Sequence, residues 1–417
     1  MSSAVPKGWQ LTPLSDHASR IRSKNVIGNT NVLTASAVDG LINQRDYFNK
    51  SVASTDISHY TLLRKGDFAY NKSYSHGYPV GVVRRLKRYD FGVLSPLYIC
   101  FSIDSDECDE TYLSYYFDSH RFERELNSVV QEGARAHGLL NIPVNDFFDR
   151  ELLLPPLPEQ KKIASILTSV DEVIENTQKQ IDKLQDLKKA SMNELLTTGI
   201  GHTEFKDSEL GRIPKSWEVL PLGQLASVQT GIAKNSKPIE DSIAVPYLRV
   251  ANVQDGYLDL TEMKTIEIPK SKFNRYLLQN GDVLMNEGGD FDKLGRGTVW
   301  RGEITGCVHQ NHVFAVRPDQ TVLTPEYLKF VAGSEYGKGY FINNSKQSTN
   351  LASINSTQLK EMPIPLASLG EQESIVMNLK SIESFVEIRQ KKLSQTQSLK
   401  KSLMQDLLTG KVRVKVN

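Results

Sequence analysis

Polar and aromatic side chains that can contact nucleic acid gather in matching stretches of the chain. The two stretches are LLRKGDFAYNKS and LLQNGDVLMNEG. In each of them, a Gly-Asp turn and a short predicted strand precede a polar loop. Amide, guanidinium and aromatic groups on exposed loops suit hydrogen bonds to base edges and contacts to phosphates. The alternative is that these loops are polar only because they are solvated. The predicted interface has as candidates Asn71, Lys72, Tyr74, His76, Arg84, Arg85, Lys234, Lys237, Asn286, Lys293, Arg296, Gln310, Asn311 and Lys346.

Charge is segregated in the first half, although the whole chain carries a net charge of only +1. Residues 60–90 hold seven basic and two acidic side chains, a net charge of +5, whereas residues 104–110 hold five acids and no base. One surface is therefore suited to an anion and another repels it. We expect Arg84 and Arg85 to contact phosphate. The alternative is that they form salt bridges with the acidic run 104–110.

Two short motifs resemble catalytic sites but lack the required groups. A base-modifying amino-methyltransferase needs a polar and an aromatic residue around its two prolines, whereas Leu154-Pro155-Pro156-Leu157 has leucine at both ends. The segment 333–338 resembles a phosphate-binding loop, but it is one residue short and Gly339 replaces the metal-binding hydroxyl. We predict no catalytic residue in this chain.

Two further clusters fail as nuclease or metal sites. Glu262 and Lys264 with Asp255 or Asp259 imitate a nuclease triad, although the aspartate spacing is cramped and such triplets arise by chance. A strand over 309–312 would place its two histidines, three residues apart, on opposite faces. The sequence therefore predicts no metal site, and the segment 309–312 is better suited to hydrogen bonding at the edge of the second domain.

The helices that must position these loops occur as two copies of one sequence pattern. Residues 159–197 and 371–409 form the same helical pattern at a constant offset of 212, and the flanking segments repeat as well. The apolar residues step by alternating threes and fours, which predicts two heptad seams that pair with each other. The chain enters each helix from a globular domain, so we expect the pair to be antiparallel. Its candidate contact residues are Ile163, Leu167, Val170, Ile174, Ile181, Leu184, Leu195, Ile375, Leu379, Ile382, Val386, Leu393, Leu403 and Leu407.

Local signals mark the helix ends. Prolines at 155, 156 and 158 begin the first helix, and Ser368 with Glu371 predicts a capping box for the second. Gly199, Gly201 and Gly410 end them. Shorter surface helices with tyrosines are expected over 111–127 and 325–339. A generic coiled-coil dimerisation arm is the simpler alternative, but duplication of the flanking domains argues against it.

Composition limits the class of protein. A chain of 417 residues with 39% hydrophobic content can bury two ordinary cores. The sequence has no run of eighteen apolar residues and no apolar N-terminal signal segment. Its three cysteines have no paired spacing, which indicates reduced thiols and a cytoplasmic protein.

The whole chain resembles the specificity subunits of type I restriction–modification systems. The resemblance rests on the helix entry PLPEQKKIASIL, on LLTTGIGHTEFKDSELGRIPKSWEVLPLG between the domains, and on the repeat that ends in KKSLMQDLLTGKVRV. It implies an α+β fold with a pseudo-twofold internal repeat, in which two target-recognition domains alternate with two long helices that pair as an antiparallel coiled coil. The entry to the second helix departs from the pattern at 367–370, which puts the symmetry of docking in question.

The resemblance also divides the chain into parts with separate roles. It implies target-recognition domains at 1–154 and 213–365, helical spacers at 155–200 and 366–410, a linker at 201–212 and a tail at 411–417. Each recognition domain would recognise half of a bipartite DNA target, and the helices would dock two methyltransferase subunits and the restriction subunits. S-adenosylmethionine, ATP and Mg²⁺ would be bound by those partners, and this chain would bind no cofactor.

Three other functions remain open on the sequence. One is the specificity subunit of a related system whose partner carries both methylation and cleavage. Another is a coiled-coil adaptor that binds no DNA, which would show no salt-dependent retention on DNA. The third is a self-sufficient methyltransferase, which would transfer methyl groups without a partner.

If the helical pair sets the gap between half-sites, adding a heptad before Leu195 and another before Leu407 keeps the seams in phase. The pair lengthens by about 10 Å, at ~1.5 Å per residue. At ~3.4 Å per base pair, the preferred half-sites move about three base pairs apart, with some loss of affinity from the added twist of the duplex. Inserting one residue rotates the seam by ~100° and disrupts assembly. Methylation of a library with randomised spacers measures this, and an active heptad variant with unchanged spacer preference would contradict the prediction.

Overall fold

The computed structural model describes residues 5–36, 39–48, 54–73, 78–129, 131–132, 140–234, 240–290, 293–347 and 352–416. The chain divides into two compact units, which we call unit 1 and unit 2. Unit 1 comprises Met1–Gln178 and Lys391–Asn417, and unit 2 comprises Lys179–Gln390. Each unit therefore combines one globular region with a part of both long helices.

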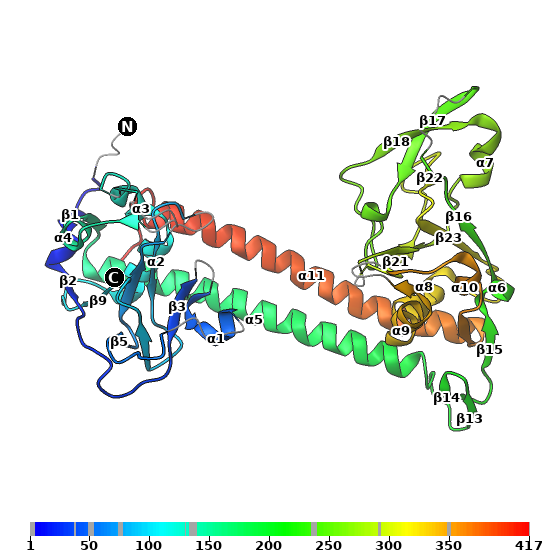
Figure 1. The fold of residues 1–417 in the computed structure, drawn as a ribbon, viewed down its shortest axis with the longest axis horizontal. Coiled ribbons are helices and arrows are strands. Elements are labelled where there is room, and N and C mark those ends of the chain that lie inside the picture. Colours follow the sequence, from blue (N-terminus) through cyan, green and yellow to red (C-terminus); the bar gives the residue numbers. More distant parts are fainter. Residues whose placement is uncertain are drawn as a thin grey trace. The chain divides into compact units, whose positions relative to one another are not determined.

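The globular region of unit 1 is built from short strands and helices, which are coloured blue to cyan in Figure 1. In chain order they are β1 (Gln10–Pro13), η1 (Leu14–Asp16), β2 (Ala18–Arg20), β3 (Leu33–Ser36), β4 (Gly40–Asn43), α1 (Gln44–Phe48), β5 (Thr61–Arg64), β6 (Phe68–Asn71), β7 (Val82–Arg85), β8 (Phe91–Leu94), β9 (Ile99–Ile103), α2 (Glu110–Asp118), α3 (Arg121–Leu126), β10 (Gln131–Glu132), β11 (Leu140–Asn141), α4 (Val144–Phe148) and β12 (Glu151–Leu154). The long helix α5 (Leu157–Leu195) follows.

Unit 2 has the same kinds of element. In chain order they are β13 (Phe205–Ser208), β14 (Gly211–Pro214), β15 (Glu218–Pro221), α6 (Leu222–Leu225), β16 (Ala226–Thr230), β17 (Ser242–Leu248), η2 (Val250–Asn252), β18 (Lys264–Pro269), η3 (Lys270–Lys272), α7 (Phe273–Tyr276), β19 (Val283–Asn286), β20 (Gly288–Gly289), β21 (Gly297–Val299), β22 (Val308–His309), β23 (Val313–Pro318), α8 (Pro325–Gly333), α9 (Glu335–Asn344), β24 (Lys346–Gln347), β25 (Ala352–Ser353), α10 (Ser356–Lys360) and β26 (Pro363–Leu366). The second long helix, α11 (Leu369–Leu407), ends the series.

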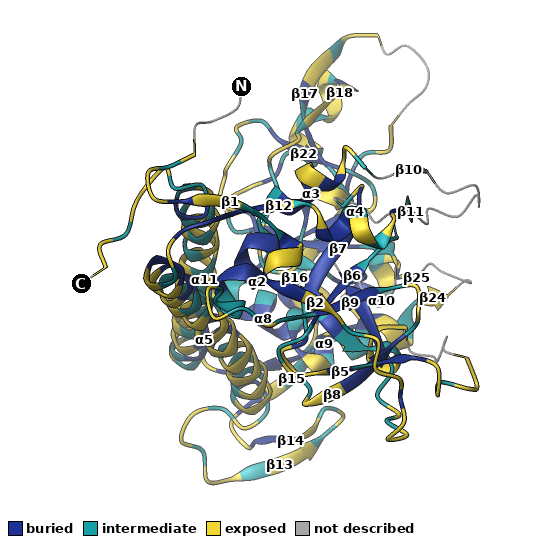
Figure 2. Ribbon diagram, turned by 90° about the vertical axis from the view of Figure 1, so that its left-hand side faces the viewer, coloured by how far each residue is buried: buried dark blue, intermediate teal, exposed yellow. Residues whose placement is uncertain are grey.

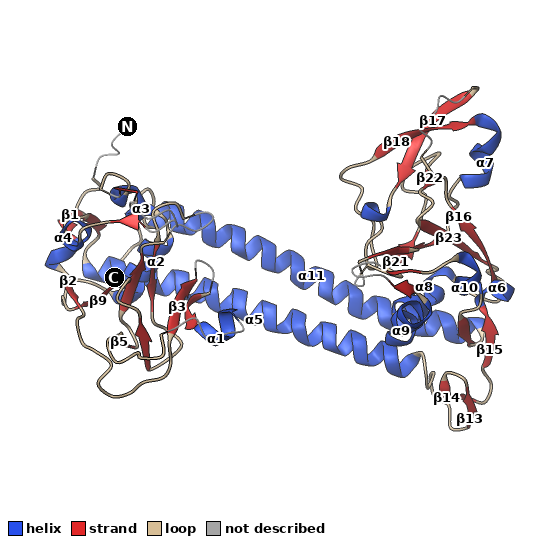
Figure 3. Ribbon diagram, in the orientation of Figure 1, coloured by secondary structure: helices blue, strands red, loops and turns tan. Residues whose placement is uncertain are grey.

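The same four-stranded antiparallel sheet occurs in both units (Figure 3). Its strand order is β2-β9-β6-β7 in unit 1 and β16-β23-β19-β21 in unit 2. A separate antiparallel pair joins the first and last strands of each globular region, β1 with β12 and β15 with β26. The predicted α+β fold with an internal repeat is thus confirmed. Unit 2 adds the sheet β18-β17-β22, whose apolar side chains form a small separate core.

The Gly-Asp turn before the central strand is also duplicated. Gly66 and Gly281 have positive φ angles of 104° and 94°, which a residue with a side chain rarely adopts. The carboxylates that follow close the turn in the same way: Asp67 accepts a hydrogen bond from the backbone N–H of Arg64, and Asp282 from that of Gln279. These turns lead into β6 and β19 as the sequence predicts.

The two long helices pair antiparallel, as predicted (green and orange in Figure 1). In unit 1, Asp171 of α5 forms a salt bridge with Lys400 of α11. In unit 2, Lys188 of α5 forms one with Glu383 of α11. Both helices begin and end two residues before the repeated segments, and the expected terminators Gly199 and Gly410 have positive φ angles. No helix within the described ranges is long and apolar enough to cross a membrane.

A carboxylate near the start of each long helix binds an indole from the preceding globular region. The indole Nε1 of Trp9 donates to Glu159 at 3.2 Å, and that of Trp217 donates to Glu371 at 2.9 Å. Both tryptophans are at most 5% exposed. The predicted capping box is therefore only half correct, because Ser368 Oγ accepts from the backbone N–H of Glu371 while the carboxylate of Glu371 turns to the indole.

The same carboxylates also bind the segment that follows the other helix. In unit 1, the guanidinium of Arg413, beyond α11, donates two hydrogen bonds of 2.7 Å to Glu159. In unit 2, His202, beyond α5, lies 2.8 Å from Glu371, which also accepts from the backbone N–H of Ile200. Each carboxylate thus joins a globular region, the start of one helix and the exit from the other.

The next residue in each helix is a buried glutamine. Gln372 accepts a hydrogen bond from the backbone N–H of Thr324 and donates to the carbonyls of Val322 and Ala367. Gln160 makes the equivalent three bonds in unit 1, with Asp109, Glu107 and Pro155. These glutamines are 0–1% exposed, and each satisfies three backbone groups, of which the carbonyl of Pro155 or Ala367 is the most deeply buried.

The expected surface helices with tyrosines are wrong in two respects. Residues 111–127 and 325–339 each lie in two short helices, α2 with α3 and α8 with α9, and the first helix of each pair begins at a capping side chain, Asp109 or Thr324. Their tyrosines are also largely internal: Tyr112 and Tyr327 are fully buried. The aromatic rings of these segments serve the core, where they pack beside the starts of the long helices.

Replacing Gln372 with leucine should lower the free energy of unfolding by about 3 kcal/mol. The change removes the partner of one N–H donor and two carbonyl acceptors, one of them fully buried and two partly buried, and an unsatisfied buried group costs ~1–3 kcal/mol. Chemical denaturation followed by circular dichroism measures the loss. Gln390→Leu, on an exposed position of the same helix, is the matched control, and equal midpoints for the two variants would contradict the prediction.

Candidate nucleic-acid interface

The loop after β6 contains the first candidates. Asn71 is half-buried, and its side chain accepts a hydrogen bond from the backbone N–H of Ser73. Lys72 is half-buried as well, and desolvation, helped by the charge of Arg20, lowers the pKa of its ammonium group. Tyr74 and His76 lie outside the described residues. Lys72 is therefore the cation that this part of the loop presents.

The two arginines of β7 are held by the protein. Arg84 is 8% exposed and forms a salt bridge of 2.9 Å with Asp118. Its guanidinium also donates to backbone carbonyls and to the hydroxyl of Tyr78. Arg85 pairs with Glu110, which belongs to the acidic run 104–110, and donates to Gly66 and Thr111. The salt-bridge alternative therefore holds for Arg85, whereas Arg84 uses a carboxylate outside that run.

Three candidates around β19 and β21 make contacts within unit 2. Asn286 is 1% exposed, and its side chain donates to the carbonyl of Val253. Lys293 pairs with Asp290, and Arg296 donates to the amide oxygen of Gln254 at 3.3 Å. In this conformation Asn286 cannot reach a base edge, because its polar atoms lie inside the protein.

The segment 309–312 turns rather than continuing as one strand, because the backbone N–H of Val313 donates to the carbonyl of Gln310. His309 is fully buried, and burial lowers the pKa of its imidazole. Gln310 accepts from the backbone N–H of Val250. Asn311 is half-buried beside the exposed His312. The interpretation of 309–312 as one strand is therefore wrong, because β22 ends at His309 and a turn carries His312.

The remaining lysine candidates are peripheral. Lys234 and Lys346 are exposed at the ends of described segments, and Lys237 lies outside them. Among the candidates that the structure describes, Lys234 and Lys346 are exposed, and Lys72, Lys293 and Asn311 are half-buried. Lys72 belongs to unit 1, and the other four belong to unit 2.

The candidate residues of the helix pair lie along one buried stripe on each helix (Figure 2, where the outward faces of α5 and α11 are mostly yellow). The fully buried members are Ile163, Leu167, Ile181, Ile375, Leu379 and Leu407. The half-buried members are Val170, Ile174, Leu184, Leu195, Ile382, Val386, Leu393 and Leu403. The heptad pattern did not reveal that Ala164 and its counterpart Val376 are also buried.

Apolar residues also remain on the outer faces of the helices at repeated positions. Val173 and Leu399 of unit 1 are 40% and 53% exposed. Phe385 and Leu187, which occupy the same places in the repeat, are 53% and 51% exposed in unit 2. Each unit therefore presents the same pair of uncovered apolar positions.

A half-open cavity of about 960 Å³ in unit 1 brings Arg84 and Arg85 together with basic side chains that were not among the sequence candidates. It lies among the β3–β4 hairpin, β7 with the loop that follows it, the α2–α3 corner and the last turns of α11. Its basic lining residues are Arg84, Arg85, Lys87, Arg88, Arg121, Arg124, Lys400 and Lys401. Among the described residues, its acidic lining side chains are Asp39 and Asp118. The basic run 60–90 was a signal for part of this cavity, but no sequence pattern joins it to α11.

Comparison with known proteins gives the family. The model of the type I restriction modification DNA specificity domain matches twice, at residues 28–186 and 214–397. The MjaVIII specificity subunit of a type I restriction enzyme from Methanocaldococcus jannaschii is 29% identical, over 78% of this chain and 75% of that protein. The EcoKI specificity subunit from Escherichia coli is 22% identical, over 77% of this chain and 67% of that protein.

Solved structures show the same fold. The type I restriction–modification system S subunit from M. genitalium superposes with a TM-score of 0.53 at 14% identity, covering 98% of this chain and 97% of that one. A chain from a structure on complex assembly of the type I system gives a TM-score of 0.58 at 16% identity, over 98% and 100%. With both of its halves matched by the family model, this chain belongs to the type I restriction–modification DNA specificity family.

Proposed function

We propose that this chain binds duplex DNA at a bipartite target and that each unit recognises one half-site. The single observation that carries the proposal is the doubled four-stranded sheet, each copy with its own polar loops and its own core. A protein with two similar halves suits a ligand with two similar halves. The loops themselves differ between the units, so the two half-sites should differ in sequence.

The chemistry of methylation and cleavage belongs to other subunits in this proposal. No side chain of this chain is assigned a catalytic role, and S-adenosylmethionine, ATP and Mg²⁺ would be bound by methyltransferase and restriction partners in the cytoplasm. In the alternative system, one partner subunit carries out both methylation and cleavage. That alternative differs from this proposal only in which partner subunit docks on the chain. A DNA-free adaptor is less well supported, because it gives no reason for two recognition-type regions within one chain.

The repeated apolar positions on the helices are suited to two copies of one methyltransferase subunit. Each unit presents the same pair, and identical partners require equivalent contact points. Uncovered apolar side chains on a helix are favourable only if a partner removes them from water. One methyltransferase subunit would therefore dock on each unit.

The first test exchanges residues 1–154 for the matching region of a relative with a different target. Because each unit has its own core and loops, recognition should be modular. One half of the methylated sequence should change while the other half and its partners persist. Sequencing of methylated bases gives the result, and simultaneous change of both halves would overturn the proposal.

The second test replaces Leu187 and Phe385 with serine, which should remove one methyltransferase subunit from the complex. Loss of these two contacts should weaken docking on unit 2 about tenfold or more. Adding Val173→Ser and Leu399→Ser should release the second subunit.

Native mass spectrometry counts the subunits for this test. Gln390→Ser with Gln395→Ser, both exposed on α11, is the matched control and should leave two subunits bound. A quadruple variant that keeps both subunits would show that docking uses another surface.

A further inference from the structure

The cavity of unit 1 carries more positive charge than its own carboxylates neutralise. Arg84 and Arg85 pair with Asp118 and Glu110, and Lys400 lies 2.6 Å from Asp171. Within the part of the chain that the structure describes, no carboxylate pairs with Arg88, Arg124 or Lys401. These three cations, which come from three separate segments of the chain, therefore remain available to an external anion. All three side chains are exposed to solvent.

Lys87 lies within this concentration of charge. Its Nζ lies 5.7 Å from the ring centroid of Tyr115, and the Lys400 Nζ lies 5.4 Å from the same centroid. Desolvation by the surrounding protein lowers the pKa of Lys87, and the charges of Arg85 and Lys400 lower it further against the opposing effect of Asp118 and Asp171. An anion in the cavity would relieve this repulsion.

The equivalent surface of unit 2 has far fewer cations. Leu86 and Trp300 occupy the same place, because the carbonyl of each accepts from the glycine of the Gly-Asp turn. Lys87 therefore corresponds to Arg301, and Arg88 corresponds to Gly302. The pairing of β7 with β6 and of β21 with β19 gives the same alignment, in which Arg84 corresponds to Thr298 and Arg85 to Val299. Four basic residues of unit 1 are matched by one in unit 2.

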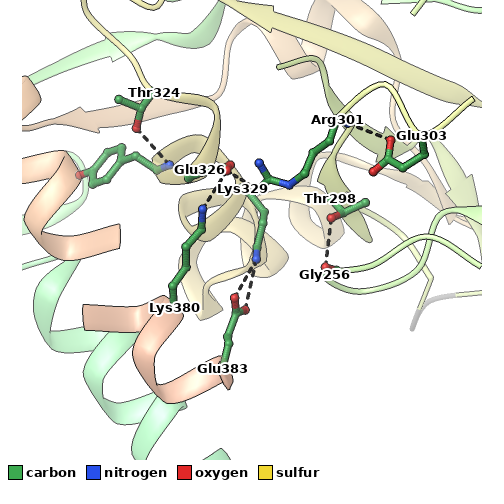
Figure 4. A network of polar contacts seen from close by, with 10 residues as sticks. Gly256, Thr298, Arg301, Glu303, Thr324, Glu326, Lys329, Lys380 and Glu383 are labelled. Carbon is green, nitrogen blue, oxygen red and sulfur yellow. Dashed lines mark hydrogen bonds and ion pairs between the residues drawn. The ribbon is translucent and has the colours of Figure 1, made fainter. Parts of the chain in front are cut away.

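The cations that unit 2 does keep are neutralised within the unit (Figure 4). Arg301 and Lys380 both pair with Glu326, and Lys329 pairs with Glu383. Burial opposes ionisation of Glu326, but hydrogen bonds from Lys380 and Arg301 outweigh it and hold the pKa of this carboxyl below its usual value. One carboxylate oxygen of Glu326 therefore neutralises both Arg301 and Lys380.

The two lysines at the end of the repeated helices give the sharpest comparison. Lys188 and Lys189 of α5 are the counterparts of Lys400 and Lys401 of α11. Lys189 lies 2.8 Å from Glu335 of α9, whereas Lys401 has no carboxylate partner among the described residues. The lysine at this helix position is thus neutralised by an ion pair in unit 2, whereas its counterpart in unit 1 is available to an external anion.

We propose that the basic cavity of unit 1 binds backbone phosphates of duplex DNA regardless of sequence, so that unit 1 is the electrostatic anchor of a complex in which unit 2 lacks this contact. The inference rests on the proposed function. Duplex DNA is the favoured phosphate source, because Arg88, Arg124 and Lys401 come from different elements around one wide cavity and suit several phosphates in a row. A free polyphosphate carries the same chemistry and is the competing source.

The test compares the full chain with Arg88→Ala, Arg124→Ala and Lys401→Ala variants, singly and together. Affinity for target and mixed-sequence duplexes is measured against salt concentration. Each phosphate contact contributes about 0.9 to the slope of log K against log salt, so the triple variant should lose up to about 2.7. Target and mixed-sequence DNA should weaken by the same factor. Lys189→Ala is the matched control and should leave the slope unchanged.

A second arm separates the two phosphate sources. Inorganic triphosphate is titrated at constant ionic strength, and its binding to the chain and its competition with DNA are measured. Tight triphosphate binding that the triple variant abolishes, with an unchanged DNA slope, would assign the cavity to a small anion and overturn the proposal.

The DNA results distinguish two failures. If the native chain binds the duplex and the folded triple variant keeps the native slope, the inference fails while the proposed function stands. If the native chain binds no DNA at any salt concentration, both fail. An equal loss in Lys189→Ala would show a general charge effect and would also overturn the assignment to this cavity.

Discussion

The fold depends on the Glu-Gln pair near the start of each long helix. Glu159 and Glu371 each bind a buried tryptophan from the preceding globular region and a group from the segment that follows the other helix. The buried glutamine that follows satisfies three partly or fully buried backbone groups. Because buried polar groups are costly when unpaired, these contacts fix how each helix leaves its globular region. A unit is thereby assembled from segments far apart in the chain.

The repeat has kept its framework and changed its surface. The four-stranded sheets, the Gly-Asp turns, the Trp–Glu bonds and the helix salt bridges occur in both units. The charged surface beside the helices does not, since unit 1 leaves cations open where unit 2 pairs Lys189 and Arg301 with glutamates. A duplicated scaffold with different surfaces is what the recognition of two different half-sites by one chain requires.

The fold was largely predictable from the sequence, whereas the candidate site was not. The in-register repeat, the heptad seams and the glycine terminators are local or periodic signals, so the helix pair and the doubled architecture followed from them. Burial of Asn286, the pairing of Arg84 with Asp118 and the meeting of Arg124 with Lys401 at one cavity depend on contacts between distant segments. Residue type alone gave no sign that Arg84 is structural while Arg88, four residues later, is open.

The central claim is that one chain carries two separate recognition units for one DNA target. Sequencing the modified bases in cells that carry the complete system, compared with cells in which only this chain is deleted, tests it most directly. The account predicts that methylation depends on this chain and falls at a motif with two defined parts separated by an unspecified gap. A continuous motif, or methylation that persists unchanged without this chain, would contradict it.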